Sequence, residues 1–199
     1  MKLPDKPPAR DRWLTRDEAA ALLRAARSAD QGKSRHLCRF ILLGLYTGTR
    51  HDAINKIKWM PTTVGGWVDL RAGMLYRRGT GEGESSKRRT PVPLSKRLRW
   101  HLERWKRDSA THVVEFAGAP ITSVRRSFGT ARKRAGLGPD VTPHILRHTF
   151  ATWAVQAGAP LGLVAAALGT TEAIVERVYG HHAPERLRGV VETVANRRR

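Results

Sequence analysis

The chain is short of cysteine and of acidic residues, and both shortages restrict its chemistry. Cys38 is the single cysteine among 199 residues, so neither an intramolecular disulfide nor a cysteine-based metal site can form. Only 17 acidic residues oppose 37 lysines and arginines, which leaves a formal net charge of +20. A cation of this strength has either a polyanionic partner or a solubility problem. Nucleic acid fits better than a membrane surface, because the basic residues are spread over many segments.

Long apolar runs are also missing. The start, MKLPDKPPARDRW, lacks the apolar core of a secretory signal, and the longest apolar run, near residues 40–46, is too short to span a bilayer. We therefore expect a cytoplasmic protein with no membrane partner.

Apolar spacing and turn residues predict a mainly α fold with a small three-stranded antiparallel β-sheet. Residues 1–12 are polar and proline-rich and are interpreted as a linker or truncated segment, followed by one domain over 13–199. Thr15 and Glu18 form a capping-box pattern before the first helix, and a buried helix should end at Gly48. Further helices are expected within 51–59, 95–108, 122–135, 143–157, 161–168, 171–180 and 184–196. The strands are expected within 65–70, 73–79 and 87–94, with a separate hairpin over 112–121.

The helix expected over 122–135 carries five cations and no acid. These residues are Arg125, Arg126, Arg132, Lys133 and Arg134. One interpretation is a solvated face, which charge runs usually form. The other is a surface that binds DNA, which the absence of compensating carboxylates favours.

Residue types that suit phosphodiester cleavage gather near the C-terminal end. His144 and Arg147 are three residues apart in a helical run and would share a face. An arginine fork matches two phosphate oxygens, and Arg50 offers a second fork, while His144 suits proton transfer. Tyr179 can act as a nucleophile if nearby cations favour the phenolate, since a free phenol has a pKa of about 10. We interpret His148 as a packing or supporting residue.

Three motifs follow one another along the chain: T-G-T-R ending at Arg50, H-x-L-R-H-T-F-A-T from His144, and L-G followed by a tyrosine. Together they resemble the tyrosine recombinase family, also called phage integrases. The resemblance extends from LTRDEAAALL near residue 14, through V-P-L at 92–94, to the C-terminal segment. It implies the family's catalytic-domain fold and site-specific DNA recombination of the integration or excision type. We expect the family's N-terminal core-binding domain to be absent, so that the chain is a fragment or a natural short form.

The resemblance also implies a role for each site residue. Arg50, His144 and Arg147 would act on the scissile phosphate, and Tyr179 would attack it, leaving a 3′-phosphotyrosyl link and a free 5′-hydroxyl. Lys87 would protonate the leaving oxygen. A second strand's 5′-hydroxyl then resolves the link, and no metal or other cofactor is needed.

Two positions depart from the family pattern. Thr170 follows Leu168-Gly169 where most members have a histidine or tryptophan, and Ser85-Ser86 stand where an earlier lysine is expected. A threonine hydroxyl can donate to a phosphate but carries no charge. We therefore regard Thr170, His181 and His182 as candidate phosphate or transition-state contacts.

The partners implied are double-stranded DNA and further copies of the chain, as a homotetramer on paired sites, with room for a directionality factor. The protein would belong to a bacterium or phage and act at the nucleoid. Residues 183–196 either dock onto a neighbouring protomer or pack on their own domain. Two other functions share the fold or the chemistry: a DNA-binding protein with impaired or lost catalysis, and a type IB topoisomerase, against which the short length and integrase-like motifs argue.

Overall fold

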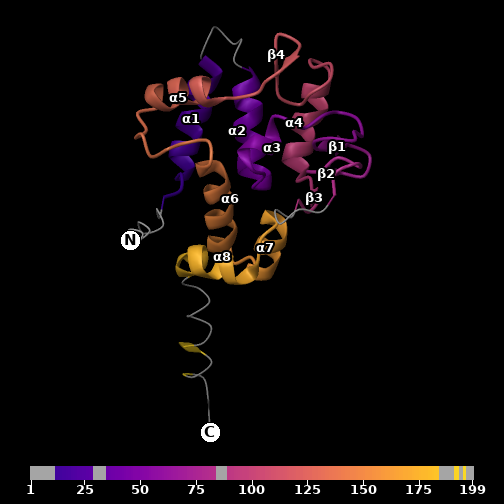
Figure 1. Cartoon of the computed structure of the whole chain (residues 1–199). Coiled ribbons are helices and arrows are strands. Elements are labelled where there is room, and N and C mark those ends of the chain that lie inside the picture. The colour runs from indigo at the N-terminus through magenta and orange to yellow at the C-terminus, as the bar shows by residue number, and fades with distance from the viewer. Residues whose placement is uncertain (1–11, 29–34, 84–88, 184–190, 193–194, 196–199) are drawn as a thin grey trace, which may run out of the picture.

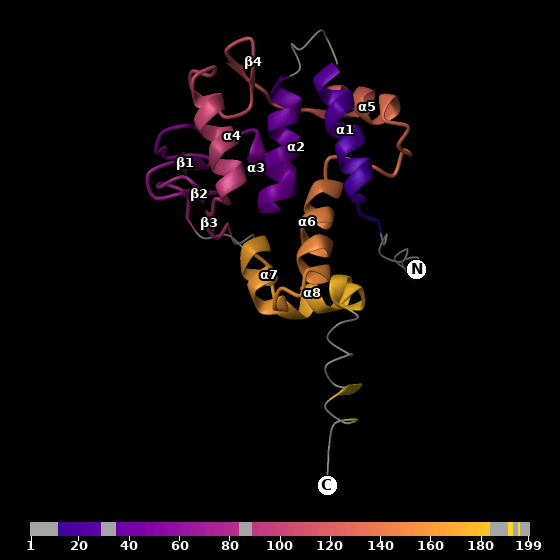
Figure 2. The same cartoon turned by 180° about the vertical axis from the view of Figure 1, so that it is seen from behind.

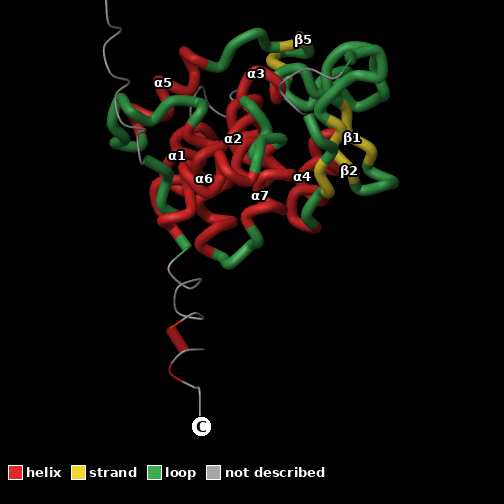
Figure 3. Tube along the Cα trace, turned by 60° about the horizontal axis from the view of Figure 1, so that its bottom comes forward, coloured by secondary structure: helices red, strands yellow, loops and turns green. Residues whose placement is uncertain are grey.

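The computed structural model describes residues 12–28, 35–83, 89–183, 191–192 and 195. Lys87, the pair Ser85-Ser86 and most of the helix expected over 184–196 lie outside the described residues. Helices are the main secondary structure of the described part, and the short strands gather on one side of the helices (Figure 3). The mainly α class with a small antiparallel sheet is thus confirmed.

The helices are α1 Arg16–Ser28, α2 Arg35–Thr47, α3 His51–Ile54, α4 Lys96–Lys106, α5 Arg125–Arg134, α6 Ile145–Gln156, α7 Leu161–Leu168 and α8 Glu172–Tyr179. The strands are β1 Trp67–Asp69, β2 Met74–Tyr76, β3 Val92–Pro93, β4 Glu115–Phe116 and β5 Ala119–Pro120.

The first helix begins at the predicted capping box. The Glu18 backbone N–H donates to the Thr15 hydroxyl at 3.1 Å, and the Thr15 N–H donates to the Glu18 carboxylate at 2.9 Å. Two N–H groups that the helix leaves without a partner are thereby satisfied. The local sequence is sufficient to start α1 at this point.

Helix α2 is the central element of the fold and packs against α1 and α6 (Figure 1). Its apolar residues Leu37, Phe40, Ile41 and Leu43 are fully buried, because the run is apolar on most sides. The helix ends as predicted at Gly48, whose φ of +61° lies in the left-handed region that glycine tolerates.

The predicted sheet and hairpin are both present. The sheet order is β1-β2-β3, antiparallel throughout, and the β1–β2 register places Trp67 opposite Tyr76. Their rings stack at 4.2 Å between centroids. The β4–β5 hairpin turns through Ala117 and Gly118, with φ of 51° and 77°, as its tight two-residue turn requires.

The helix after Arg50 is shorter than expected. Helix α3 ends at Ile54, whereas the sequence pattern predicted helix as far as Trp59. The reason is tertiary pairing: the Lys58 N–H donates to the Gly66 carbonyl at 2.8 Å, and the Val68 N–H donates to the Lys58 carbonyl at 3.0 Å. Pairing with the edge of the sheet replaces the last helical turn.

Helix α6 is shared by two apolar clusters. Ile145 and Leu146, at its start, belong to the large core around α2, whereas Ala151 and Val155 belong to a smaller cluster with α7 and α8. Helices α7 and α8 lie across the end of α6 in both views (Figure 1, Figure 2). The smaller cluster includes Tyr179, so the expected nucleophile is packed into this second core.

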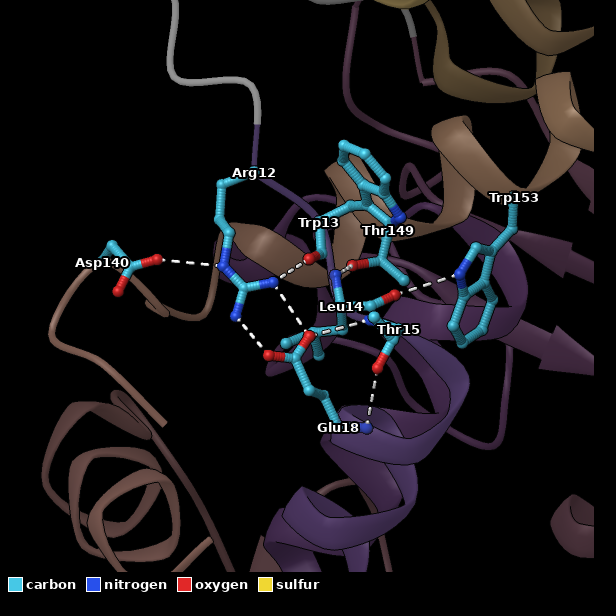
Figure 4. Close-up of polar contacts among 8 residues, drawn as sticks. All are labelled: Arg12, Trp13, Leu14, Thr15, Glu18, Asp140, Thr149 and Trp153. Carbon is cyan, nitrogen blue, oxygen red and sulfur yellow. Dashed lines mark hydrogen bonds and ion pairs between the residues drawn. The ribbon is translucent and has the colours of Figure 1, made fainter. Parts of the chain in front are cut away.

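The segment before α1 is tied to α6 by hydrogen bonds (Figure 4). The Leu14 N–H donates to the buried Thr149 hydroxyl at 2.9 Å, and the Trp153 indole N–H donates to the Leu14 carbonyl at 3.1 Å. Arg12 forms ion pairs with Glu18 at 2.7 Å and with Asp140 at 3.0 Å. Arg12, the last residue of the expected linker, therefore contacts α1 and the segment before α6. None of the helices described is both long and apolar enough to cross a membrane.

Candidate active site

Arg147 lies on α6 and bridges the ends of two other helices. Its Nη1 donates to the Gly48 carbonyl at 2.9 Å, just beyond α2, and its Nη2 donates to the Leu168 carbonyl at 2.8 Å, at the end of α7. Carbonyls at helix C-termini carry partial negative charge, so they hold the cation in place. These bonds use two of the five N–H groups of a guanidinium. Burial, followed by the charge of Arg50, lowers the pKa of Arg147 to about 10, which leaves it charged at neutral pH.

Arg50 and Arg147 line one small pocket together with other cations. Arg50, Arg77, Arg89, Arg147 and Lys56 contribute to its wall. Asp52 is the single acid among the described lining residues. A concave surface with this excess of positive charge is suited to a phosphate group.

Arg77 is a site residue that the sequence reasoning missed. It is 4% exposed, and it donates to the Thr90 and Ala167 carbonyls at 2.7 Å each. Burial, then the nearby Arg147 and Arg50, lowers its pKa to about 10. Strand alternation could have indicated this burial: successive side chains of a strand point to opposite faces, so Arg77, two residues after the buried Leu75, shares its face.

His144 lies at the start of α6, near two further imidazoles. The ring centroids of His51 and His144 are 6.1 Å apart, and those of His144 and His148 are 4.8 Å apart. Burial, then the charges of His148, Arg147, His51 and Arg50, lowers the pKa of His144 to about 4. His144 is therefore neutral at pH 7 and suits hydrogen bonding to a phosphate better than service as a cationic acid.

Tyr179 is the last residue of α8 and is only 8% exposed. Its hydroxyl lies 2.9 Å from Nδ1 of His148. Burial raises the pKa of Tyr179, and the charge of Arg147 lowers it by less. The phenol is thus protonated at neutral pH and next to a hydrogen-bonding imidazole.

The other candidate contacts lie on the segments that flank α8, with Thr170 before it and His181 and His182 after it. Thr170 follows Gly169, which has a φ of +63°, and its N–H donates to the Ala165 carbonyl at 3.0 Å. His182 packs edge-on against Trp13 at 4.4 Å between ring centroids, and the His181 ring is 3.9 Å from that of His182. The phosphate-donor role of these three residues stays a prediction.

The basic helix α5 borders a groove that reaches His144. Val124 and Phe128 are buried on its inner side. Arg125 and Arg132 line the groove together with His144. The remaining cations of the helix are exposed: Arg126, Lys133 and Arg134.

Comparison with known proteins shows the family of this chain. The model of the phage integrase family matches residues 12–186, so the chain belongs to that family. A similar curated relative is the tyrosine recombinase XerA of Thermococcus kodakarensis, 30% identical over 198 residues, which cover 96% of this chain and 66% of the relative.

Two solved structures share the fold. The catalytic domain of bacteriophage HP1 integrase has a TM-score of 0.63 and 21% identity, covering 94% of this chain and 98% of that one. The Tn1549 transposon integrase in complex with circular intermediate DNA has a TM-score of 0.72 and 18% identity, covering 96% of this chain and 68% of that one. Among the curated relatives that match over more than nine-tenths of this chain, it spans between about half and two thirds of their length.

Proposed function

We propose that this chain is the catalytic domain of a tyrosine site-specific recombinase, which cleaves and rejoins DNA through a 3′-phosphotyrosyl intermediate. The observation that carries the proposal is the convergence of Arg50, His144, Arg147 and Tyr179 from separate segments of the chain. The hydrogen bonds of Arg147 to the ends of α2 and α7, and the packing of α8, bring these segments together. Family membership supports the same reaction.

In the proposed reaction the Tyr179 oxygen attacks the phosphorus and the bond to the 5′ oxygen breaks. Arg147 and Arg50 stabilise the charge on the non-bridging oxygens, and neutral His144 donates a hydrogen bond to one of them. Lys87 donates a proton to the leaving oxygen. Attack by a 5′-hydroxyl on the phosphotyrosine reverses these steps. Each step exchanges one phosphoester for another, so the reaction needs no external energy source or cofactor.

We propose double-stranded DNA as the partner, bound across α5 and the groove beside His144. The Tn1549 integrase, which shares the fold, is solved with DNA, and the net charge of +20 suits the same partner. Because the chain spans only part of its relatives, the tetramer on paired sites, the directionality factor and the action at the nucleoid are proposed for the whole protein. The docking of residues 183–196 on a neighbour belongs to the same proposal.

The experiment is covalent trapping on a labelled suicide half-site. Wild type should form a protease-sensitive adduct at the 3′ end of the cleaved strand, and Tyr179→Phe should form none. Tyr46→Phe is the matched control, because this tyrosine lies in α2 and is not among the residues proposed to act on the phosphate. Salt-sensitive DNA binding without any wild-type adduct would favour the DNA-binding alternative. Efficient relaxation of supercoiled DNA by the isolated chain would favour the topoisomerase.

The same assay tests the replacement of the usual histidine or tryptophan. Thr170→Ala, and alanine at both His181 and His182, should each slow cleavage if they supply a phosphate donor. Loss of one oxyanion donor costs on the order of 10²–10³ in rate. Unchanged cleavage in the double variant would remove both histidines from the proposed machinery.

A further inference from the structure

The contact between Tyr179 and His148 has no role in the reaction steps proposed above. His148 follows Arg147 directly on α6, and consecutive helical residues point about 100° apart. Arg147 therefore reaches the ends of α2 and α7, while His148 is directed towards α8. One turn of α6 thus presents a phosphate-binding cation and an imidazole to the same centre.

We propose that His148 is the general base that takes the hydroxyl proton of Tyr179 during strand cleavage and returns it during rejoining. The inference rests on the proposed recombinase function and names a residue that the family resemblance did not assign. It also replaces the interpretation of His148 as a packing or supporting residue.

The geometry meets the requirement for direct proton transfer. The Tyr179 hydroxyl and Nδ1 of His148 are 2.9 Å apart, within the reach of a general base. Tyr179 is 8% exposed, and its side chain packs among apolar residues of α6, α7 and α8. The residue is therefore largely shielded from bulk water, and the imidazole is the proton acceptor that lies within hydrogen-bonding distance of its hydroxyl.

The electrostatics favour a neutral imidazole in the resting state. The titratable groups near His148 are Arg147 on its own helix, His144 just before that helix, and Tyr179 on α8. Burial, then the charge of Arg147, lowers the pKa of His148 below its usual value. A neutral ring with its proton on Nε2 presents the Nδ1 lone pair to the phenol. Since burial raises the pKa of Tyr179, the phenol does not ionise unaided at neutral pH.

Every proton that moves during cleavage and rejoining has a donor and an acceptor. As the bond from the tyrosine oxygen to phosphorus forms, the phenol proton moves to Nδ1 and the phosphorus–5′-oxygen bond breaks. The 5′ oxygen receives its proton from a different group, proposed above as Lys87. In rejoining, the 5′-hydroxyl returns its proton to that same group as its oxygen attacks phosphorus, and the imidazolium of His148 protonates the departing Tyr179 oxygen.

The test measures single-turnover cleavage by His148→Ala and His148→Asn over a range of pH. Both variants should be slower than wild type at pH 7 by about 10²-fold or more, the usual contribution of a general base. His148→Asn keeps a hydrogen-bonding group near the Nδ1 position but cannot accept a proton there. The deficit should shrink as pH rises towards the pKa of the phenol, because hydroxide then removes the proton.

A substrate with a 5′-bridging sulfur separates this role from protonation of the leaving group. A thiolate leaves without a proton, so the substrate should restore Lys87→Ala but not His148→Ala. DNA affinity and the thermal midpoint of each variant verify folding, and His101→Ala on α4 serves as a histidine control. Rescue of His148→Ala by sulfur, wild-type rates for His148→Asn, or a deficit that does not change with pH would each overturn the proposal. A wild-type chain that forms no adduct would instead refute the recombinase function.

Discussion

Replacing Gly48 by alanine should damage both the stability of the fold and the alignment of Arg147. Gly48 has a φ of +61°, and its carbonyl accepts the Nη1 bond of Arg147 at 2.9 Å. An added Cβ would lie 2.5 Å from Cδ1 of Phe150 and 2.9 Å from Cδ2 of Leu168. Both the left-handed backbone and the steric overlap therefore oppose the substitution.

The two effects can be separated by a matched variant. The left-handed conformation costs alanine about 1–2 kcal/mol, and overpacking a filled core costs about 1–3 kcal/mol more. Gly73 has a similar φ of +67°, but a Cβ there would meet no atom within 4 Å. Gly73→Ala should thus show the backbone cost alone, and Gly48→Ala should lose about 1–3 kcal/mol more in its free energy of unfolding.

Urea unfolding followed by tryptophan fluorescence measures this difference, and the trapping assay measures its consequence for activity. A shift of the reacting groups by about 1 Å can cost about 10²-fold in rate. Cleavage should therefore fall in Gly48→Ala and stay near wild type in Gly73→Ala. Equal losses of stability in the two variants would refute the steric argument.

Three further predictions concern other parts of the structure. The hydrogen bond from Arg12 lowers the pKa of Glu18 in the folded protein. The Glu18 carboxylate therefore stabilises the fold at pH values above its pKa in the unfolded chain, and this stabilisation is lost as the pH falls through its pKa in the folded protein. Glu18→Gln should accordingly lose less stability than wild type between about pH 5 and pH 2 in urea titrations. Arg77→Lys cannot reach both the Thr90 and the Ala167 carbonyl. The unfolding free energy should drop by about 1.5–3 kcal/mol for the lost hydrogen bond to a charged group; an unchanged urea midpoint would contradict this. Arg125→Ala and Arg132→Ala should each reduce the salt dependence of DNA binding. The slope of log K against log salt concentration should become shallower by about 0.9 for each DNA phosphate that the arginine neutralises in wild type. Arg99→Ala on α4 should leave this slope unchanged.

Much of the fold could be predicted because its signals are local. The capping box at Thr15 and Glu18, the glycine that ends α2 and the turn at Ala117-Gly118 each satisfy backbone groups of their own segment. Such signals fail where distant pairing takes over. Helix α3 stops early because Lys58 pairs with the edge of the sheet, a partner that helical periodicity cannot reveal.

The candidate site divides in the same way. Arg50, His144, Arg147 and Tyr179 were identified from the types and order of residues, since cleavage of a phosphodiester requires cations, a proton carrier and a nucleophile. Arg77 was missed because its burial depends on two carbonyls contributed by other segments. His148 was given a packing role because helical spacing shows which face a residue occupies, but not which side chain meets it.

The sequence by itself determined the family, the order of the elements and the residues that carry the chemistry, because these depend on residue types and short-range spacing. The tertiary structure decided which groups touch. It placed Arg147 against the ends of two helices, buried Arg77 beside it and brought the Tyr179 hydroxyl to 2.9 Å from His148. Those contacts join residues between 21 and 99 positions apart in the chain. Only the packing of α2, α6, α7 and α8 around their shared cores brings them within hydrogen-bonding distance.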